Sequence, residues 1–184
     1  ILAHRVLWSF LVLAPLVAVT RRGDEIRTIL ADPRTALMLL GSTLMIATNW
    51  LLFIVSVNTG RVIESSLGYF INPLVNVLLG YLFLSERLRG PQRASLLLAG
   101  AGVALLVGVH GTVPWISVAL AVTFAFYALL RKMDPVESLA GLTFETGILA
   151  PMALCYIAWG AVSGDGSFLT GMARFDGLLP LAGI

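Results

Sequence analysis

Residues 65–85 read SSLGYFINPLVNVLLGYLFLS, a run of twenty-one residues without a charged side chain. A membrane-spanning α-helix needs about 20 mostly apolar residues, so this run predicts one span. Charged residues cut the rest of the chain into similar lengths. The further predicted spans are residues 5–20, 36–57, 94–109, 115–130 and 139–161, with the start of another at 177–184. The sequence His-Gly-Thr-Val-Pro at residues 110–114 is a turn signal that divides the fourth span from the fifth.

The composition agrees with several membrane spans. Hydrophobic residues make up 58% of the 184 residues and charged residues 12%, whereas a soluble domain has about 45–50% and about 25%. This indicates an all-α polytopic membrane protein. The chain starts without Met and stops within an apolar stretch, so we expect it to be an internal piece of a longer protein.

The basic residues indicate an orientation. Nine of the twelve Lys and Arg residues fall in three alternating loops: Arg21, Arg22, Arg27, Arg34, Arg87, Arg89, Arg93, Arg131 and Lys132. Cytoplasmic loops collect Lys and Arg, so we expect this side to be cytoplasmic and the lipid bilayer to surround the spans. Since the net charge is only +2 and there is no basic run, no nucleic acid is expected as a partner.

Polar residues within spans are the first candidates for function. Tyr69, Asn72 and Asn76 are spaced i, i+3, i+7 and therefore share one helix face. Pro73 lacks a backbone N–H and disturbs the carbonyl at Tyr69, which makes it the expected hinge. Interrupted helices with nearby amides form substrate sites in transporters. The other interpretation, equally open, is a kinked helix whose two Asn residues bind neighbouring helices.

Three further residues are candidates for substrate binding. Asn49, near the middle of its span and beside Trp50, suits a small zwitterionic or aromatic ligand. The alternative is an interhelical hydrogen bond from Asn49 and a lipid-facing Trp50. Arg5 opens the first span, where it can bind a substrate carboxylate, pair with an acid or lie at the membrane interface.

Glu145 is the one acidic residue deep in an apolar run. A low dielectric disfavours the charged form of a carboxyl group, so Glu145 can be neutral at pH 7, as a proton-coupling group requires. The alternatives are a structural Glu145 bonded to the hydroxyl of Thr143 or Thr146, or a side chain that extends to the cytoplasmic surface.

Other chemistry has no support in the sequence. There is no HExxH motif and no Cys/His cluster for a metal, no P-loop, and no nucleophile with its partners; we therefore expect neither an enzyme nor a cofactor. Gly100, Ala104 and Gly108 form a small-residue stripe that permits close helix packing, within the chain or in a homodimer.

Several motifs together resemble one family. Residues 66–74, SLGYFINPL, with Asn-Val-Leu at 76–78 and Leu-Ser-Glu-Arg-Leu at 84–88, resemble the signature of RarD-type permeases. These are the "chloramphenicol-sensitive protein" branch of the EamA family in the drug/metabolite transporter superfamily. Residues 4–9 (HRVLWS), 49–52 (NWLL) and 141–146 (GLTFET) resemble the same branch.

The resemblance implies ten helices in two inverted five-helix repeats with alternating access. On that map, residues 1–110 are the first EamA repeat without its first helix, and residues 111–184 are the second repeat, truncated in its third helix. Leu-Ala-Pro recurs at residues 13–15 and 149–151, five predicted spans apart, as inverted repeats require. The implied function is a permease of small metabolites in the bacterial inner (plasma) membrane, with amino acids or amphenicol-type drugs as candidate substrates. A non-transporting membrane scaffold or sensor is the alternative.

Overall fold

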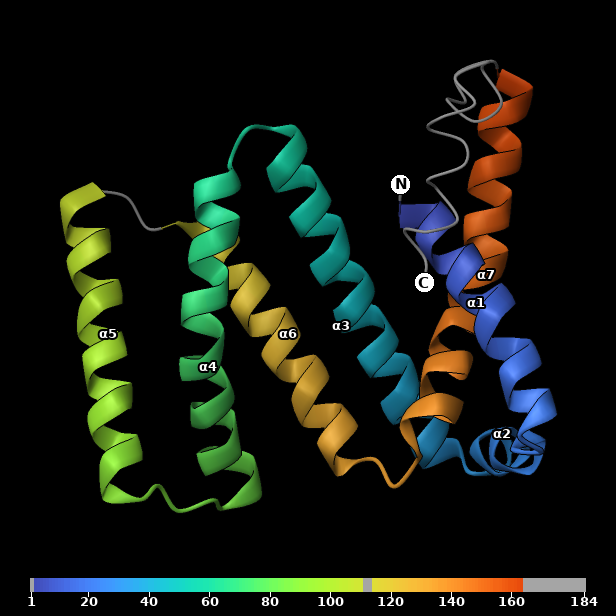
Figure 1. Ribbon diagram of the computed structural model, residues 1–184, viewed down its shortest axis with the longest axis horizontal. Coiled ribbons are helices and arrows are strands. Elements are labelled where there is room, and N and C mark those ends of the chain that lie inside the picture. The colour runs from blue at the N-terminus through green and yellow to red at the C-terminus, as the bar shows by residue number, and fades with distance from the viewer. Residues whose placement is uncertain (1, 111–113, 164–184) are drawn as a thin grey trace. The chain divides into compact units, whose positions relative to one another are not determined.

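Seven α-helices form the part of the chain that the computed structural model describes, residues 2–110 and 114–163 (Figure 1). They are α1 (Leu2–Val19), α2 (Gly23–Ala31), α3 (Pro33–Asn58), α4 (Val62–Leu84), α5 (Gly90–His110), α6 (Trp115–Met133) and α7 (Ser138–Ser163). Six of them, all but α2, are long and apolar enough to cross a membrane. The all-α prediction and the six complete spans are confirmed for these residues. The predicted start of a further span at 177–184 lies outside them.

All the spanning helices except α6 begin earlier than the predicted spans, and α3 shows why. Asp32 directly precedes α3, and its carboxylate accepts the backbone N–H groups of Arg34 at 3.2 Å and Thr35 at 3.3 Å. Pro33 occupies the first helical position, where its missing N–H is not needed. Hydrogen bonds, first from the Thr35 hydroxyl at 2.6 Å and then from the Arg34 N–H, hold the pKa of Asp32 below its ordinary value of 3.8.

Helix α2 was not predicted from the sequence, which assigned its residues to a loop. Asp24 and Glu25 stand in its first turn, where carboxylates interact favourably with the helix dipole. Its apolar side packs inward, because Ile29 forms a buried cluster with Leu39 and Ala140. The acidic first turn, followed by apolar residues three apart, was a usable signal for a short amphipathic helix.

The chain divides into two compact units. The first unit contains residues 1–43 and 134–184, and the second contains residues 44–133, so α3 contributes to both. These units follow packing, and the predicted repeat boundary at residue 110 is a separate matter that stays a prediction.

In the first unit, α7 packs against α1 and α2. Arg22, just after α1, forms an ion pair with Glu137, just before α7. Farther along, a Cβ atom at Gly147 would lie 3.1 Å from the ring of Phe10. The end of α1 therefore meets the start of α7, and the two helices are antiparallel.

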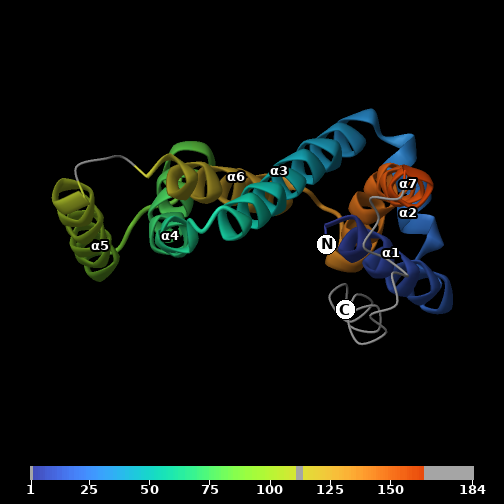
Figure 2. The same cartoon turned by 90° about the horizontal axis from the view of Figure 1, so that it is seen from above.

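In the second unit, α4 lies between α5 and α6 (Figures 1 and 2) and packs mainly against α6. Leu67 and Ile71 of α4 are buried with Ala121 of α6. The backbones approach closely at Gly68, where a Cβ atom would lie 3.2 Å from the Ser117 carbonyl oxygen. This close approach positions the candidate site described below.

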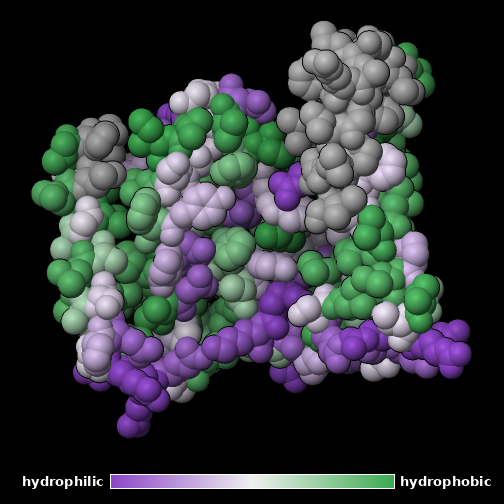
Figure 3. Space-filling model, in the orientation of Figure 1, coloured by the Kyte–Doolittle hydropathy of each residue, from purple (hydrophilic) through white to green (hydrophobic). Residues whose placement is uncertain are grey.

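The outer surface of the helices is apolar. Phe70 of α4 is 71% exposed and Leu98 of α5 is 75% exposed. Within each unit, hydrophilic side chains gather mainly at one end of the helices, and hydrophobic side chains cover their flanks (Figure 3). Large exposed apolar surfaces are unusual on soluble monomers and are expected where lipid surrounds a helix.

Candidate functional site

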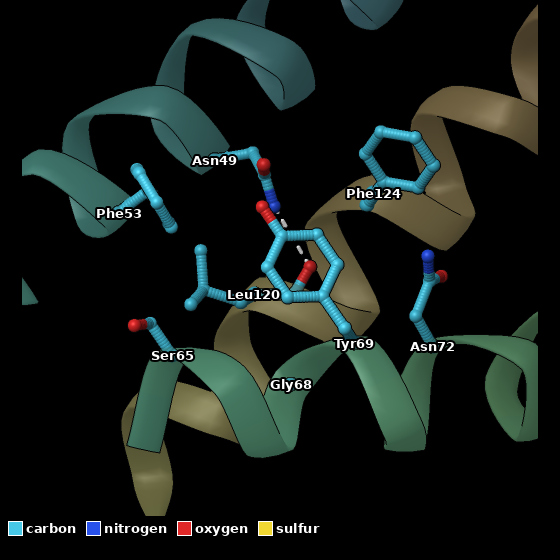
Figure 4. A pocket seen from close by; sticks show the side chains of 8 residues that line it. All are labelled: Asn49, Phe53, Ser65, Gly68, Tyr69, Asn72, Leu120 and Phe124. Atoms are coloured by element: carbon cyan, nitrogen blue, oxygen red, sulfur yellow. Dashed lines mark hydrogen bonds between the residues drawn. The ribbon is translucent and has the colours of Figure 1, made fainter. Parts of the chain in front are cut away.

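A pocket of the second unit lies between α3, α4 and α6 (Figure 4). Its lining residues are Asn49, Phe53, Ser65, Gly68, Tyr69, Asn72, Leu120 and Phe124. Three of the six predicted substrate-binding residues, Asn49, Tyr69 and Asn72, are among them. The structure thus brings together polar groups from two of the predicted spans.

Asn49 joins α3 to α6. Its Nδ2 donates to the Leu120 carbonyl oxygen at 2.8 Å and to the Thr123 hydroxyl at 2.9 Å. This is the interhelical hydrogen bond that the sequence left open as an alternative. Among the described residues, the Oδ1 atom of Asn49 accepts no hydrogen bond. One side chain can therefore hold two helices together and still offer an acceptor to a ligand.

Tyr69 and Asn72 contribute from α4. The Tyr69 ring packs edge-to-face on Phe53, with ring centroids 6.3 Å apart, and its hydroxyl points toward α3 (Figure 4). The Oδ1 of Asn72 accepts a hydrogen bond from Asn76 Nδ2 at 2.8 Å. Within the described chain, the Nδ2 of Asn72 donates no hydrogen bond, so its two N–H groups remain available to a ligand.

The lining contains amides, a phenol, a hydroxyl and aromatic rings, and it contains no charged side chain. Such a surface can bind an uncharged or zwitterionic solute by hydrogen bonds and ring contacts. The cavity volume is only about 20 Å³, which is room for about one water molecule. Sites for small ligands measure about 300–1,000 Å³, so the pocket is too small for such a ligand in this conformation.

The other predicted site residues lie elsewhere. Asn76 lines a second cavity of about 230 Å³ between α4 and α6, together with Glu86 and Lys132. Trp50 is half-buried beyond the lining of the first pocket, and Arg5 is half-buried on α1 in the first unit.

Pro73, the predicted hinge, lies within α4, and that helix runs without interruption from Val62 to Leu84. Its flexibility stays a prediction.

Glu145 lies in the first unit and is 3% exposed. Its Oε1 is 2.5 Å from the hydroxyl of Ser42 on α3. Thr143 and Thr146, the partners considered from the sequence, donate instead to carbonyl groups of their own helix, one turn earlier. Ser42 was missed because no local pattern links two residues 103 positions apart.

The Ser42 hydroxyl also lies 2.9 Å from the Leu39 carbonyl oxygen. A hydroxyl has one proton to donate, yet two acceptors are in range. The proton of Ser42 can therefore be shared between the Leu39 carbonyl oxygen and the Glu145 carboxyl group, and the second contact joins α3 to α7.

Six apolar helices of spanning length define a multi-pass membrane protein. A family model described as the EamA-like transporter family matches residues 1–108. The chain belongs to this family, and the resemblance to RarD-type permeases is confirmed.

Some of the relatives are named as transporters, and others carry the name RarD. An "uncharacterized transporter" of Vibrio cholerae is 42% identical over the whole chain and 61% of its own length. "Protein RarD" of Escherichia coli (strain K12) is 44% identical over 85% of the chain and 53% of its own length. "Chloramphenicol-sensitive protein RarD" of Pseudomonas aeruginosa is 31% identical over the whole chain and 62% of its own length. The chain thus spans less than two thirds of each relative. No solved structure matches it.

Proposed function

We propose that this chain belongs to a secondary transporter of small metabolites in a bacterial inner membrane, working by alternating access. The family and the transporter name of the Vibrio cholerae relative support this role. The basic ends of the helices would face the cytoplasm, following the charge asymmetry of the loops.

One observation carries the proposal: polar side chains of α3 and α4 converge on a small pocket between helices that are long and apolar enough to cross a membrane. Asn72 lies ten residues after the start of α4, which is about 15 Å along the helix and close to mid-membrane. A polar side chain at that depth lowers the stability of the protein in the membrane, so it is usually present because function requires it. Asn49, Tyr69 and Asn72 are therefore the proposed substrate ligands. Trp50 and Arg5, which do not line this pocket, stay predicted contacts of the substrate.

The uncharged lining indicates which substrates to test first. Phe53 and Phe124 offer aromatic faces, and the amides of Asn49 and Asn72 offer an acceptor and donors. Amphenicol-type drugs, which are suggested by the name of the Pseudomonas relative, and amino acids both combine polar groups with an apolar part. Either class requires the pocket to expand from its present volume.

Alternating access would supply that expansion. We assign the flexible point to Pro73, because α4 lacks one backbone hydrogen bond there. The proposed architecture is ten helices in two inverted repeats, divided at residue 110. The antiparallel packing of α1 and α7, both carrying Leu-Ala-Pro, supports it, since an inverted repeat reverses equivalent helices.

We assign proton coupling to Glu145. Its burial and its contact with Ser42 support the exchange of a neutral for a charged carboxyl group during transport. A homodimer through the Gly100 face of α5 stays a proposal, supported by the open space around that glycine.

The test is transport by the natural full-length protein in proteoliposomes, with radiolabelled amino acids and an amphenicol. The double change Asn72→Ala and Asn76→Ala should lower transport about tenfold or more, because two hydrogen-bonding groups of about 1 kcal/mol each are lost. The matched control is Asn58→Ala, an exposed amide at the end of α3, which should leave transport unchanged.

If the double variant transports as fast as the unchanged protein at the same protein level, the proposed substrate site is wrong. The scaffold or sensor alternative makes a different prediction, because such a protein needs no water-accessible cavity. Cys placed at residue 72, with Cys155 changed to Ser, would then not react with water-soluble thiol reagents.

A further inference from the structure

The second cavity, of about 230 Å³, lies at the basic end of the second unit, where α4 and α6 terminate. Aliphatic side chains and Gly80 form most of its wall. Three polar side chains complete the lining, and they are Asn76, Glu86 and Lys132. The volume is many times that of the pocket lined by Asn49 and Asn72.

Glu86 is held in place by the way α4 ends. Ser85 takes a left-handed conformation with a φ of 54°, which turns the chain back on the helix. The Glu86 N–H then donates to the Gly80 carbonyl oxygen at 3.2 Å. A Cβ atom at residue 80 would lie 2.8 Å from Glu86 Oε2. The carboxylate can therefore take this position because residue 80 is glycine.

Lys132 approaches from the last turn of α6 and forms an ion pair with Glu86. Both side chains are about half exposed, at 59% and 48%. The pair ties the end of α4 to the end of α6 beside the cavity that both residues line. Breaking it would free these ends to separate.

A hydrogen bond of Asn76 links the lining of this cavity to the lining of the pocket between α3, α4 and α6. It lines the larger cavity, and its Nδ2 donates to Asn72, which lines the smaller one. Both cavities border the contact between α4 and α6, where Val75 packs against the buried clusters on either side of it.

We propose that the larger cavity is the vestibule on the basic side of the substrate path and that the Glu86–Lys132 pair is a latch that limits access to it. The path itself rests on the proposed function, whereas the latch is a property of the fold. An exposed ion pair shifts an equilibrium by up to about fivefold, about 1 kcal/mol at 1.4 kcal/mol per tenfold. That is enough to bias a gate and too little to lock it.

The test measures access to the cavity. Ala128, a half-buried lining residue of α6, is changed to Cys in full-length protein whose Cys155 is Ser. The rate of reaction with N-ethylmaleimide, a neutral reagent, is followed in detergent. Lys132→Gln and Glu86→Gln should each raise the rate about two- to fivefold. Gly80→Ala should do the same without a change in charge, by displacing Glu86.

Two controls complete the design. Exchanging the charges, with Glu86→Lys and Lys132→Glu together, should return the rate to that of the parent protein, which a merely misfolded variant cannot do. Arg87→Gln removes a neighbouring exposed charge that does not line the cavity and should leave the rate unchanged.

Equal rates in the parent protein and all three opening variants would overturn the latch, as would an equally large effect of Arg87→Gln. Labelling needs no substrate, so its outcome is independent of transport. If the labelling rates change as predicted but the protein transports none of the tested solutes, the latch would be supported and the substrate path would be contradicted.

Discussion

Gly68 allows the close approach of α4 and α6, and changing it to Ala tests whether the helices pack as described. A Cβ atom there would lie 3.2 Å from both the Leu120 Cβ and the Ser117 carbonyl oxygen. Both atoms are fixed to the backbone of α6, so neither can rotate away. The helices must separate by a few tenths of an ångström, at the pocket that Gly68 and Leu120 line.

Two effects oppose each other in this variant. Replacing Gly by Ala within a helix stabilises it by about 1 kcal/mol, while overpacking destabilises by about 1–3 kcal/mol. Gly102→Ala isolates the first effect, because nothing lies within 4 Å of a Cβ atom at that position. The free energy of unfolding should therefore be about 1–3 kcal/mol lower for Gly68→Ala than for Gly102→Ala.

The assay is reversible unfolding of both variants in mixed micelles, with increasing denaturing detergent. Small residues between membrane helices act by letting backbones approach, so only the α4 glycine should be sensitive. A Gly68→Ala protein as stable as Gly102→Ala would refute the close packing of α4 on α6.

Three other predictions concern single side chains, each measured by unfolding. Asn49→Ala should destabilise by about 1 kcal/mol and Thr123→Val by about half of that, because buried membrane hydrogen bonds average about 0.6 kcal/mol; equal losses would contradict the two-bond geometry. Glu145→Gln should change stability by less than about 1 kcal/mol, because the amide can still bond the Ser42 hydroxyl; a loss as large as that of Glu145→Ala would contradict the contact with Ser42. Asp32→Ala should lower the unfolding temperature near neutral pH. Because the folded-state pKa of Asp32 lies below 3.8, this difference should persist above that pH and vanish as the pH falls through the folded-state pKa; a difference that grows on acidification would contradict the cap.

The spans could be predicted from the sequence because charge is so costly in lipid that charged residues mark the helix ends. Their exact limits could not, because caps such as Asp32 extend helices into the flanking charged segments. The predicted shared face of Tyr69 and Asn72 follows from helical periodicity, and both line the pocket. Asn76 shares that face but lies about 10 Å beyond Tyr69 along the helix, which places it in the next cavity.

Contacts between distant residues were beyond the reach of the sequence. Asn49 and Thr123 are 74 positions apart, and Ser42 and Glu145 are 103 apart. Both pairs depend on which helices are neighbours and on their rotation, which spacing within one helix does not determine. The sequence identified Asn49 and Glu145 as unusual polar residues in apolar spans, but not the groups that satisfy them.

Ligand binding tests the candidate site most directly. The thermal unfolding of the full-length protein is followed with amino acids, small metabolites and amphenicols at increasing concentration, since a ligand at about 100 times its Kd stabilises by about 2.7 kcal/mol. We predict a stabilising compound whose effect disappears in Asn72→Ala and survives in Asn58→Ala. A compound that stabilises the Asn72→Ala protein as much as the unchanged protein would contradict the assignment of the pocket between α3, α4 and α6.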